Sequence, residues 1–183
     1  MRKISLPNLI TVIRIIGAVT MIFFAPISVT FIVLYSICGI SDVLDGFIAR
    51  ITKSASDDGA KLDSIADLIF YGIMGIKIIP LLYEQLPRYF WFVIGSILVL
   101  RAVVYAVAAL KFHRFASIHT YGNKLSGFVV FLTPYSFLID FVYGWCIIVA
   151  IVTTTAALEE LLIHIIQKKY HENVVSIFHV QAN

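Results

Sequence analysis

Residues 42–67, DVLDGFIARITKSASDDGAKLDSIAD, decide both the fold and the site, because they place six carboxylates between two strongly apolar runs. Two of these carboxylates belong to a polar turn, and the other four adjoin the apolar runs. The four are Asp42, Asp45, Asp63 and Asp67. A charged side chain near hydrocarbon costs at least ~2.5–3.5 kcal/mol on insertion scales. Four such charges together therefore need cations, water or a partner group.

The spacing of the four carboxylates indicates divalent cations. Asp42 and Asp45 are three residues apart. Asp63 and Asp67 are four residues apart, so on helices each pair projects from one face. The polar segment 53–58 suits a turn between antiparallel helices, which brings the two pairs face to face. Like charges repel strongly there, and hard cations with oxygen ligands, Mg²⁺ or Mn²⁺ rather than Zn²⁺, remove the repulsion. One pair alone would fit a solvated helix end equally well.

Small residues accompany the carboxylates and complete a larger pattern. Gly46, Ala49 and Gly59 leave room beside the cations for a flat or phosphate-bearing ligand. Together with Arg50 and the four aspartates, they match D-x2-D-G-x2-A-R-x8-G-x3-D-x3-D at every gap. On these residues the chain resembles the CDP-alcohol phosphatidyltransferase family, whose signature this is.

The resemblance implies a reaction and roles for the signature residues. A phosphatidyl group would pass from CDP-diacylglycerol to the hydroxyl of a small polar alcohol, and CMP would leave. Two divalent cations, Mg²⁺ or Mn²⁺, would be held by Asp42, Asp45, Asp63 and Asp67. Asp67 matches the aspartate taken as general base in the family, and the alternative is that it serves only as a fourth metal ligand. The residues expected at the CDP-lipid are Gly46, Ala49, Arg50 and Gly59. A homodimer is expected from the resemblance alone.

The composition predicts an all-α integral membrane protein. The 183 residues are 60% hydrophobic and 14% charged, and the mean hydropathy is +0.94, whereas soluble domains are typically about 25% charged. The length suits about six spans of ~20 residues in a single membrane domain, residues 1–183. The predicted spans are residues 9–25, 28–50, 59–82, 89–110, 125–139 and 142–158. We expect the first to begin as a short interfacial segment, with Thr11 and Arg14 on its polar side, and residues 159–183 to form an amphipathic surface tail.

The basic residues predict the orientation in the membrane. Lys and Arg gather at the N-terminus, in the second-to-third and fourth-to-fifth connections, and in the tail. The positive-inside rule then places both termini and the carboxylates on the cytoplasmic side. The net charge of +3 is read as orientation and attraction to anionic membrane lipid. No nucleic-acid partner is expected.

Three basic residues outside the signature are candidates for binding the acceptor, namely Arg101, Arg114 and Lys124. Arg101 lies inside the predicted fourth span, where a charge is a functional candidate by default. Its planar guanidinium matches the phosphate of a phosphorylated acceptor. The alternative is that Arg101 pairs with Asp42 or Asp67 and only balances charge. Arg114 and Lys124 lie on a connection where basic residues also serve as orientation signals.

The sequence leaves the acceptor open. Residues 6–14, LPNLITVIR, and the segment 122–124 resemble phosphatidylglycerophosphate synthases, whereas residues 62–72, LDSIADLIFYG, resemble phosphatidylserine synthases. We favour glycerol 3-phosphate, because an intramembrane arginine needs an anionic partner, with serine second and inositol phosphate third. A small membrane transporter or a noncatalytic scaffold are the alternatives from other classes, although a transporter is expected to show paired halves with broken helices.

Overall fold

The computed structural model describes residues 6–51, 57–112, 120–167 and 176, without the side chains of residues 6, 7, 45–47, 49, 50, 57, 58 and 60. Within these ranges every regular element is a helix. The chain forms two compact units that divide between Glu84 and Gln85. An all-helical chain is what the apolar runs predict.

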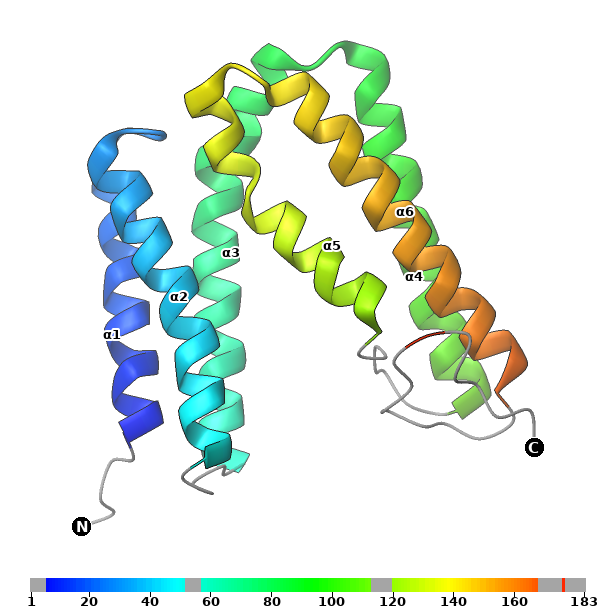
Figure 1. Cartoon of the computed structure of the whole chain (residues 1–183), viewed down its shortest axis with the longest axis horizontal. Coiled ribbons are helices and arrows are strands. Elements are labelled where there is room, and N and C mark those ends of the chain that lie inside the picture. The colour runs from blue at the N-terminus through cyan, green and yellow to red at the C-terminus, as the bar shows by residue number, and fades with distance from the viewer. Residues whose placement is uncertain (1–5, 52–56, 113–119, 168–175, 177–183) are drawn as a thin grey trace. The chain divides into compact units, whose positions relative to one another are not determined.

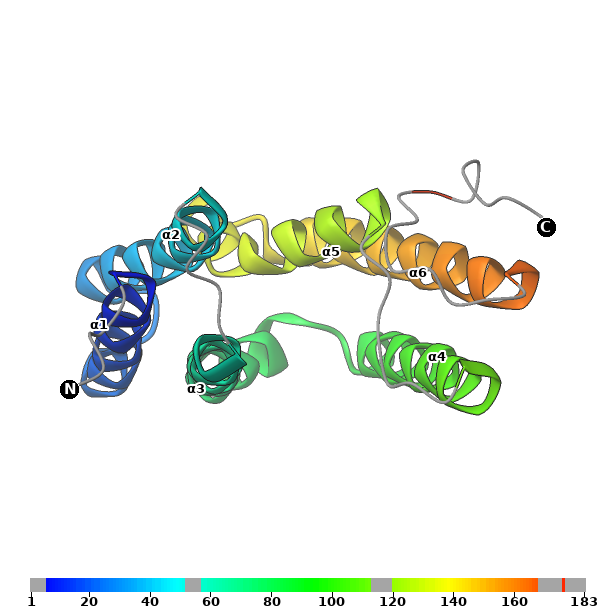
Figure 2. The same cartoon turned by 90° about the horizontal axis from the view of Figure 1, so that it is seen from below.

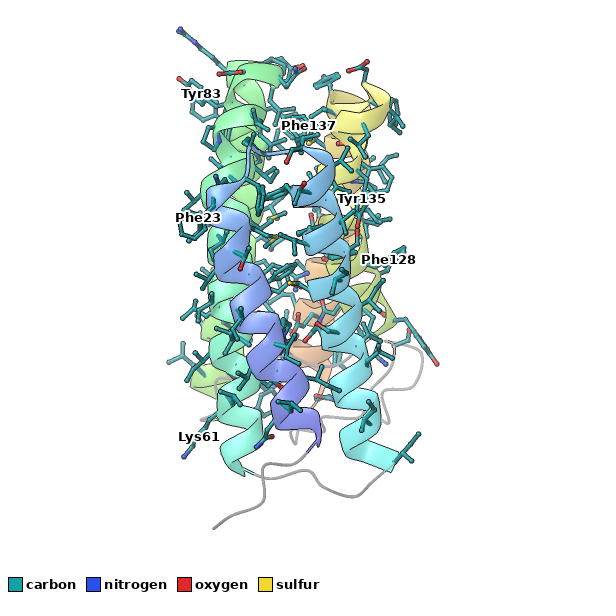
Figure 3. The ribbon with its side chains drawn as sticks, turned by 90° about the vertical axis from the view of Figure 1, so that its left-hand side faces the viewer. Phe23, Lys61, Tyr83, Phe128, Tyr135 and Phe137 are labelled. Atoms are coloured by element: carbon teal, nitrogen blue, oxygen red, sulfur yellow. The ribbon has the colours of Figure 1, made fainter. Side chains whose placement is uncertain are left out.

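The described part of the first unit contains three α-helices. They are α1 (Leu6–Thr20), which continues as the 3-10 helix η1 (Met21–Phe23), α2 (Val29–Ile51) and α3 (Asp57–Gln85). α1 and α2 pack side by side (Figure 1). α3 is joined to α2 by the stacked rings of Tyr35 and Phe70, whose centroids are 5.1 Å apart. Figure 3 shows Lys61 and Tyr83 at opposite ends of α3, and the carboxylates of α3 lie toward the Lys61 end.

The burial pattern of α1 is the reverse of that in a soluble protein. Thr11 and Arg14 are buried, whereas Leu9, Ile13 and Ile16 are exposed. An apolar outer face suits contact with lipid, and polar groups in such a helix turn toward protein. Thr11 and Arg14, which we expected on the polar side of this segment, thus face the interior of the unit.

Two contacts hold α1 and η1 in place. A Cβ added to Gly17 would lie 2.9 Å from Cys38 Sγ on α2, so the absence of a side chain at Gly17 permits the close approach of the two helices. At the other end, Lys77 Nζ on α3 donates to the carbonyl oxygens of Ile22 and Phe24 at 2.7 and 3.0 Å. This pairs backbone acceptors that a helix end leaves without intrahelical partners.

We expect Gly17→Ala to lower the free energy of unfolding of the purified protein in detergent by about 1–2 kcal/mol. Overpacking against Cys38 costs ~1–3 kcal/mol, and the higher helix propensity of Ala offsets up to ~1 kcal/mol of it. Gly72→Ala is the matched control, since an added Cβ there meets nothing within 4 Å. The double variant with Cys38→Ala should recover stability. A Gly17→Ala protein as stable as the control would show that the α1–α2 contact is not tight.

Three α-helices are also found among the described residues of the second unit. They are α4 (Arg88–Phe112), α5 (Tyr121–Phe131) with the following 3-10 helix η2 (Thr133–Ile139), and α6 (Val142–Ile166). α6 packs against both α4 and α5 (Figures 1 and 2). The α-helical part of the predicted fifth span ends just before Pro134, which lies in η2, because proline cannot continue the hydrogen-bond ladder of an α-helix.

Among the residues that the structure describes, three helices are long and apolar enough to cross a membrane, namely Lys61–Gln85, Arg88–Phe112 and Val142–Ile166. Asn8–Phe23 and Val29–Leu44 are shorter apolar helices. The six-span count therefore stays a prediction. The structure differs from the predicted surface tail, because α6 continues to Ile166 and buries Glu160 and His164. Most of the remaining tail, residues 168–175 and 177–183, lies outside the described residues.

Candidate functional site

Three of the four predicted carboxylates meet in the first unit. Asp42 comes from α2, and Asp63 and Asp67 come from successive turns of α3. One carboxylate oxygen from each lies within 4.8 Å of the other two. All three side chains are partly exposed. We call Asp42, Asp63 and Asp67 the carboxylate cluster. Their proximity agrees with the expectation that the acidic faces of two helices lie opposite each other.

Arg14 of α1 lies against this cluster and was not among the predicted site residues. Its Nη1 donates to Asp42 Oδ1, its Nη2 donates to Asp63 Oδ1, and its Nη1 is 3.3 Å from Asp67 Oδ1. The side chain of Arg14 is only 1% exposed. A signal was present in the sequence, because Arg14 is a charged residue in an apolar helix and the rule that singled out Arg101 applies to it equally.

The donor set of the cluster fits a hard divalent cation. All three groups offer carboxylate oxygens, which Mg²⁺ and Mn²⁺ prefer, and no sulfur or imidazole accompanies them among the described residues of the cluster. Among the described side chains of the cluster, one guanidinium faces three carboxylates, so their negative charge exceeds its positive charge. A cation that binds there reduces the mutual repulsion of the carboxylates.

The other signature residues lie on the same two helices. Asp45, Gly46, Ala49 and Arg50 belong to α2, but their side chains lie outside the described residues. Gly59 lies in the first turn of α3, one helical turn before Asp63. The backbone thus places the predicted lipid-side residues on helix segments that adjoin the carboxylate cluster.

A second group of polar side chains joins the helices of the second unit. Arg101 Nη1 on α4 donates to Asn123 Oδ1 on α5 and to Glu160 Oε2 on α6, both at 3.0 Å. Its Nη2 donates to Ser126 Oγ at 3.3 Å. Asn123 Nδ2 also donates to Glu160 Oε2, at 2.8 Å. These four residues form the Arg101 cluster, which links α4, α5 and α6.

The Arg101 cluster changes the interpretation of Arg101. Glu160 is 0% exposed and Arg101 is 20% exposed, so the two form a largely buried ion pair. Within the second unit Glu160 balances the charge of Arg101, and the alternative pairing with Asp42 or Asp67 of the first unit stays a prediction. Glu160 was missed because it lies in a segment that we assigned to a surface tail.

Lys124, a second candidate acceptor residue, does not belong to the Arg101 cluster. Lys124 is exposed, and its Nζ lies 5.9 Å from the centroid of the Tyr121 ring. Arg114 lies outside the described residues. A different basic residue, Lys111, links α4 to the C-terminal end of α6. Its Nζ donates to the carbonyl oxygens of His164 and Ile165 at 2.9 and 2.8 Å.

Comparison with known proteins places these residues in context. The family model described as CDP-alcohol phosphatidyltransferase matches residues 4–156, which include the carboxylate cluster, Arg14 and Arg101. A curated protein of Methanocaldococcus jannaschii, CDP-diacylglycerol–serine O-phosphatidyltransferase, is 28% identical over 120 residues. The aligned region is 65% of this chain and 52% of that relative, so the chain spans about half the length of the relative. No solved structure matches the chain significantly.

Proposed function

The chain belongs to the CDP-alcohol phosphatidyltransferase family, and on this premise we propose that it transfers a phosphatidyl group from CDP-diacylglycerol to the hydroxyl of a small polar alcohol and releases CMP. The observation that carries the proposal is the convergence of Asp42, Asp63 and Asp67 to within 4.8 Å of one another. Long apolar helices are in keeping with a lipid substrate that stays in the membrane.

The carboxylates have two tasks in this proposal. Asp42 and Asp63 hold divalent cations, with Asp45 joining them from α2 and Asp67 from α3. Two bound cations, Mg²⁺ or Mn²⁺, would neutralise the diphosphate of the CDP-lipid and orient its oxygens. Asp67 lies one turn further into α3 and accepts the proton of the incoming hydroxyl. Gly46, Ala49, Arg50 and Gly59 line the side where the CDP-lipid binds.

We propose serine as the acceptor to test first. The argument for glycerol 3-phosphate was that Arg101 requires an anionic partner, and Glu160 supplies one within the protein. The relative from Methanocaldococcus jannaschii carries serine in its name, and residues 62–72 resemble phosphatidylserine synthases. Glycerol 3-phosphate is the second candidate, because residues 6–14 resemble phosphatidylglycerophosphate synthases and Arg101 keeps a 20% exposed side chain. Inositol phosphate is third.

The proposal includes an orientation in the membrane. The proposed topology has six spans, and the described helices are spans or parts of spans. The positive-inside rule then puts both termini and the carboxylate cluster on the cytoplasmic side. The support is the distribution of Lys and Arg along the sequence. Water-soluble acceptors made in the cytoplasm then reach the site directly. A homodimer is proposed from family membership alone.

The decisive assay measures CMP release by the purified protein in detergent with CDP-diacylglycerol, with serine, glycerol 3-phosphate, inositol phosphate and inositol tested separately. We expect release with one acceptor, loss of release on chelation by EDTA, and recovery on addition of Mg²⁺ or Mn²⁺ but not of Ca²⁺ alone, since Ca²⁺ favours larger coordination shells. Turnover that is unchanged by EDTA would contradict the metal-dependent reaction. Folded protein that binds the nucleotide lipid but releases no CMP with any acceptor would favour a noncatalytic scaffold.

A further inference from the structure

We propose that Arg14 is an internal counterion of the carboxylate cluster, which stabilises the protein when divalent cations are absent and weakens their binding when they arrive. The inference rests on the proposed function, because it concerns the affinity of the same metal site. It assigns a role to a residue of α1 that lies outside the acidic signature.

The contacts of Arg14 make it a competitor for the cations. Its two terminal nitrogens donate to Oδ1 of Asp42 and Oδ1 of Asp63, and Nη1 lies 3.3 Å from Oδ1 of Asp67. A cation that uses any of these oxygens takes it from the guanidinium or shares it. Arg14 cannot lose its charge in proteins, so it does not give way by deprotonation.

The exposure of the four groups shows from which sides they are reached. Arg14 is 1% exposed, whereas the side chains of Asp42, Asp63 and Asp67 are 38%, 44% and 41% exposed. The guanidinium therefore approaches the carboxylates from the protein interior, and the carboxylates keep an open side where a hydrated cation enters. A cation held by these carboxylates would share them with the guanidinium, and two like charges bound to the same groups repel.

Two properties of the protein should therefore move in opposite directions when Arg14 is neutralised. Without Arg14, the carboxylates repel one another in the metal-free protein, so its melting temperature falls. The same uncompensated charge attracts cations more strongly, so the affinity for Mn²⁺ rises. A ligand that binds only the folded state raises the melting temperature, and the increase on adding Mn²⁺ should be larger in Arg14→Gln than in the wild type. A purely structural ion pair would lower stability without tightening Mn²⁺ binding.

The test measures Mn²⁺ binding directly, from the electron paramagnetic resonance signal of unbound Mn²⁺ over purified protein in detergent without lipid substrate. We expect Arg14→Gln to bind Mn²⁺ at least ~10-fold more tightly than the wild type. Arg14→Lys keeps the charge but lacks the planar fork that bridges two carboxylates, so it should bind between the two. Arg88→Gln is the control, because it removes a positive charge from an exposed residue at the start of α4. It should bind like the wild type.

Asp63→Asn distinguishes a failure of the proposed metal site from a failure of the proposed role of Arg14. Mn²⁺ binding that survives Asp63→Asn unchanged would overturn the metal site of the proposed function, and this inference with it. If Asp63→Asn weakens binding but Arg14→Gln binds no more tightly than the wild type, the inference alone is overturned. Should Arg14→Gln fail to fold, Arg14→Lys decides the question, since an affinity at or below that of the wild type overturns the role of Arg14.

Discussion

Asp67→Asn should lower the rate of CMP release by about 100-fold or more, the size expected for loss of a general base. The amide keeps the shape of the side chain but cannot accept the proton of the acceptor hydroxyl at neutral pH. Asp42 and Asp63 retain their carboxylates, and the amide oxygen of the substituted side chain still offers a weak ligand, so Mn²⁺ binding should fall far less than turnover. Both quantities are measured on the same preparation, by CMP release and by Mn²⁺ titration.

Two further variants define what the result for Asp67→Asn means. Asp63→Asn should lose Mn²⁺ binding together with turnover, because Asp63 is proposed as a ligand and not as the base. Asp140→Asn makes the same chemical change at an exposed residue of the second unit, where the backbone has a φ of 49° that Asn tolerates well. It should leave turnover unchanged. Wild-type turnover in Asp67→Asn would contradict the enzyme mechanism, and parallel loss of Mn²⁺ binding and turnover would make Asp67 a fourth ligand.

Removal of Arg101 should destabilise the protein by roughly 3–5 kcal/mol, the usual cost of breaking a buried ion pair from one side. Glu160 is 0% exposed, and in Arg101→Met its buried carboxylate loses the guanidinium that pairs with it. The amide of Asn123 still donates to Glu160 Oε2. Glu160→Gln should cost less, because Arg101 is 20% exposed and keeps Ser126 and Asn123 as acceptors. Thermal unfolding in detergent, followed by circular dichroism, gives both values.

The double variant Arg101→Met with Glu160→Leu tests whether the two residues act as a pair. Replacing both charges by apolar groups removes the buried charge, so stability should recover most of what Arg101→Met loses. Lys124→Met is the control for loss of a neighbouring cation, since Lys124 is exposed, and it should change stability little. If Arg101→Met unfolds at the wild-type temperature but requires more acceptor for half-maximal CMP release, Arg101 acts mainly on the acceptor and the structural interpretation of the pair fails.

Local signals in the sequence predicted the helices and the acidic half of the site. Long apolar runs predicted the helical segments, and the polar segment 53–58 predicted a connection between two helices. The i,i+4 spacing of Asp63 and Asp67 placed both carboxylates on one face of α3, because that spacing is a property of any α-helix. Such features depend on neighbours within a few turns, and they are therefore readable without knowledge of packing.

The partners of the charged groups were decided only by the tertiary structure. Arg14 meets Asp42 and Asp63 across 28 and 49 residues of sequence, and Arg101 meets Glu160 across 59. A polar residue in an apolar helix can turn toward water, lipid headgroups or protein, and periodicity alone does not distinguish these environments. The sequence by itself thus determined which residues carry charge and on which helix face they lie. Packing of the helices determined that Arg14 opposes the carboxylate cluster and that Glu160 neutralises Arg101, because buried charges are stabilised only by the groups that other helices bring to them.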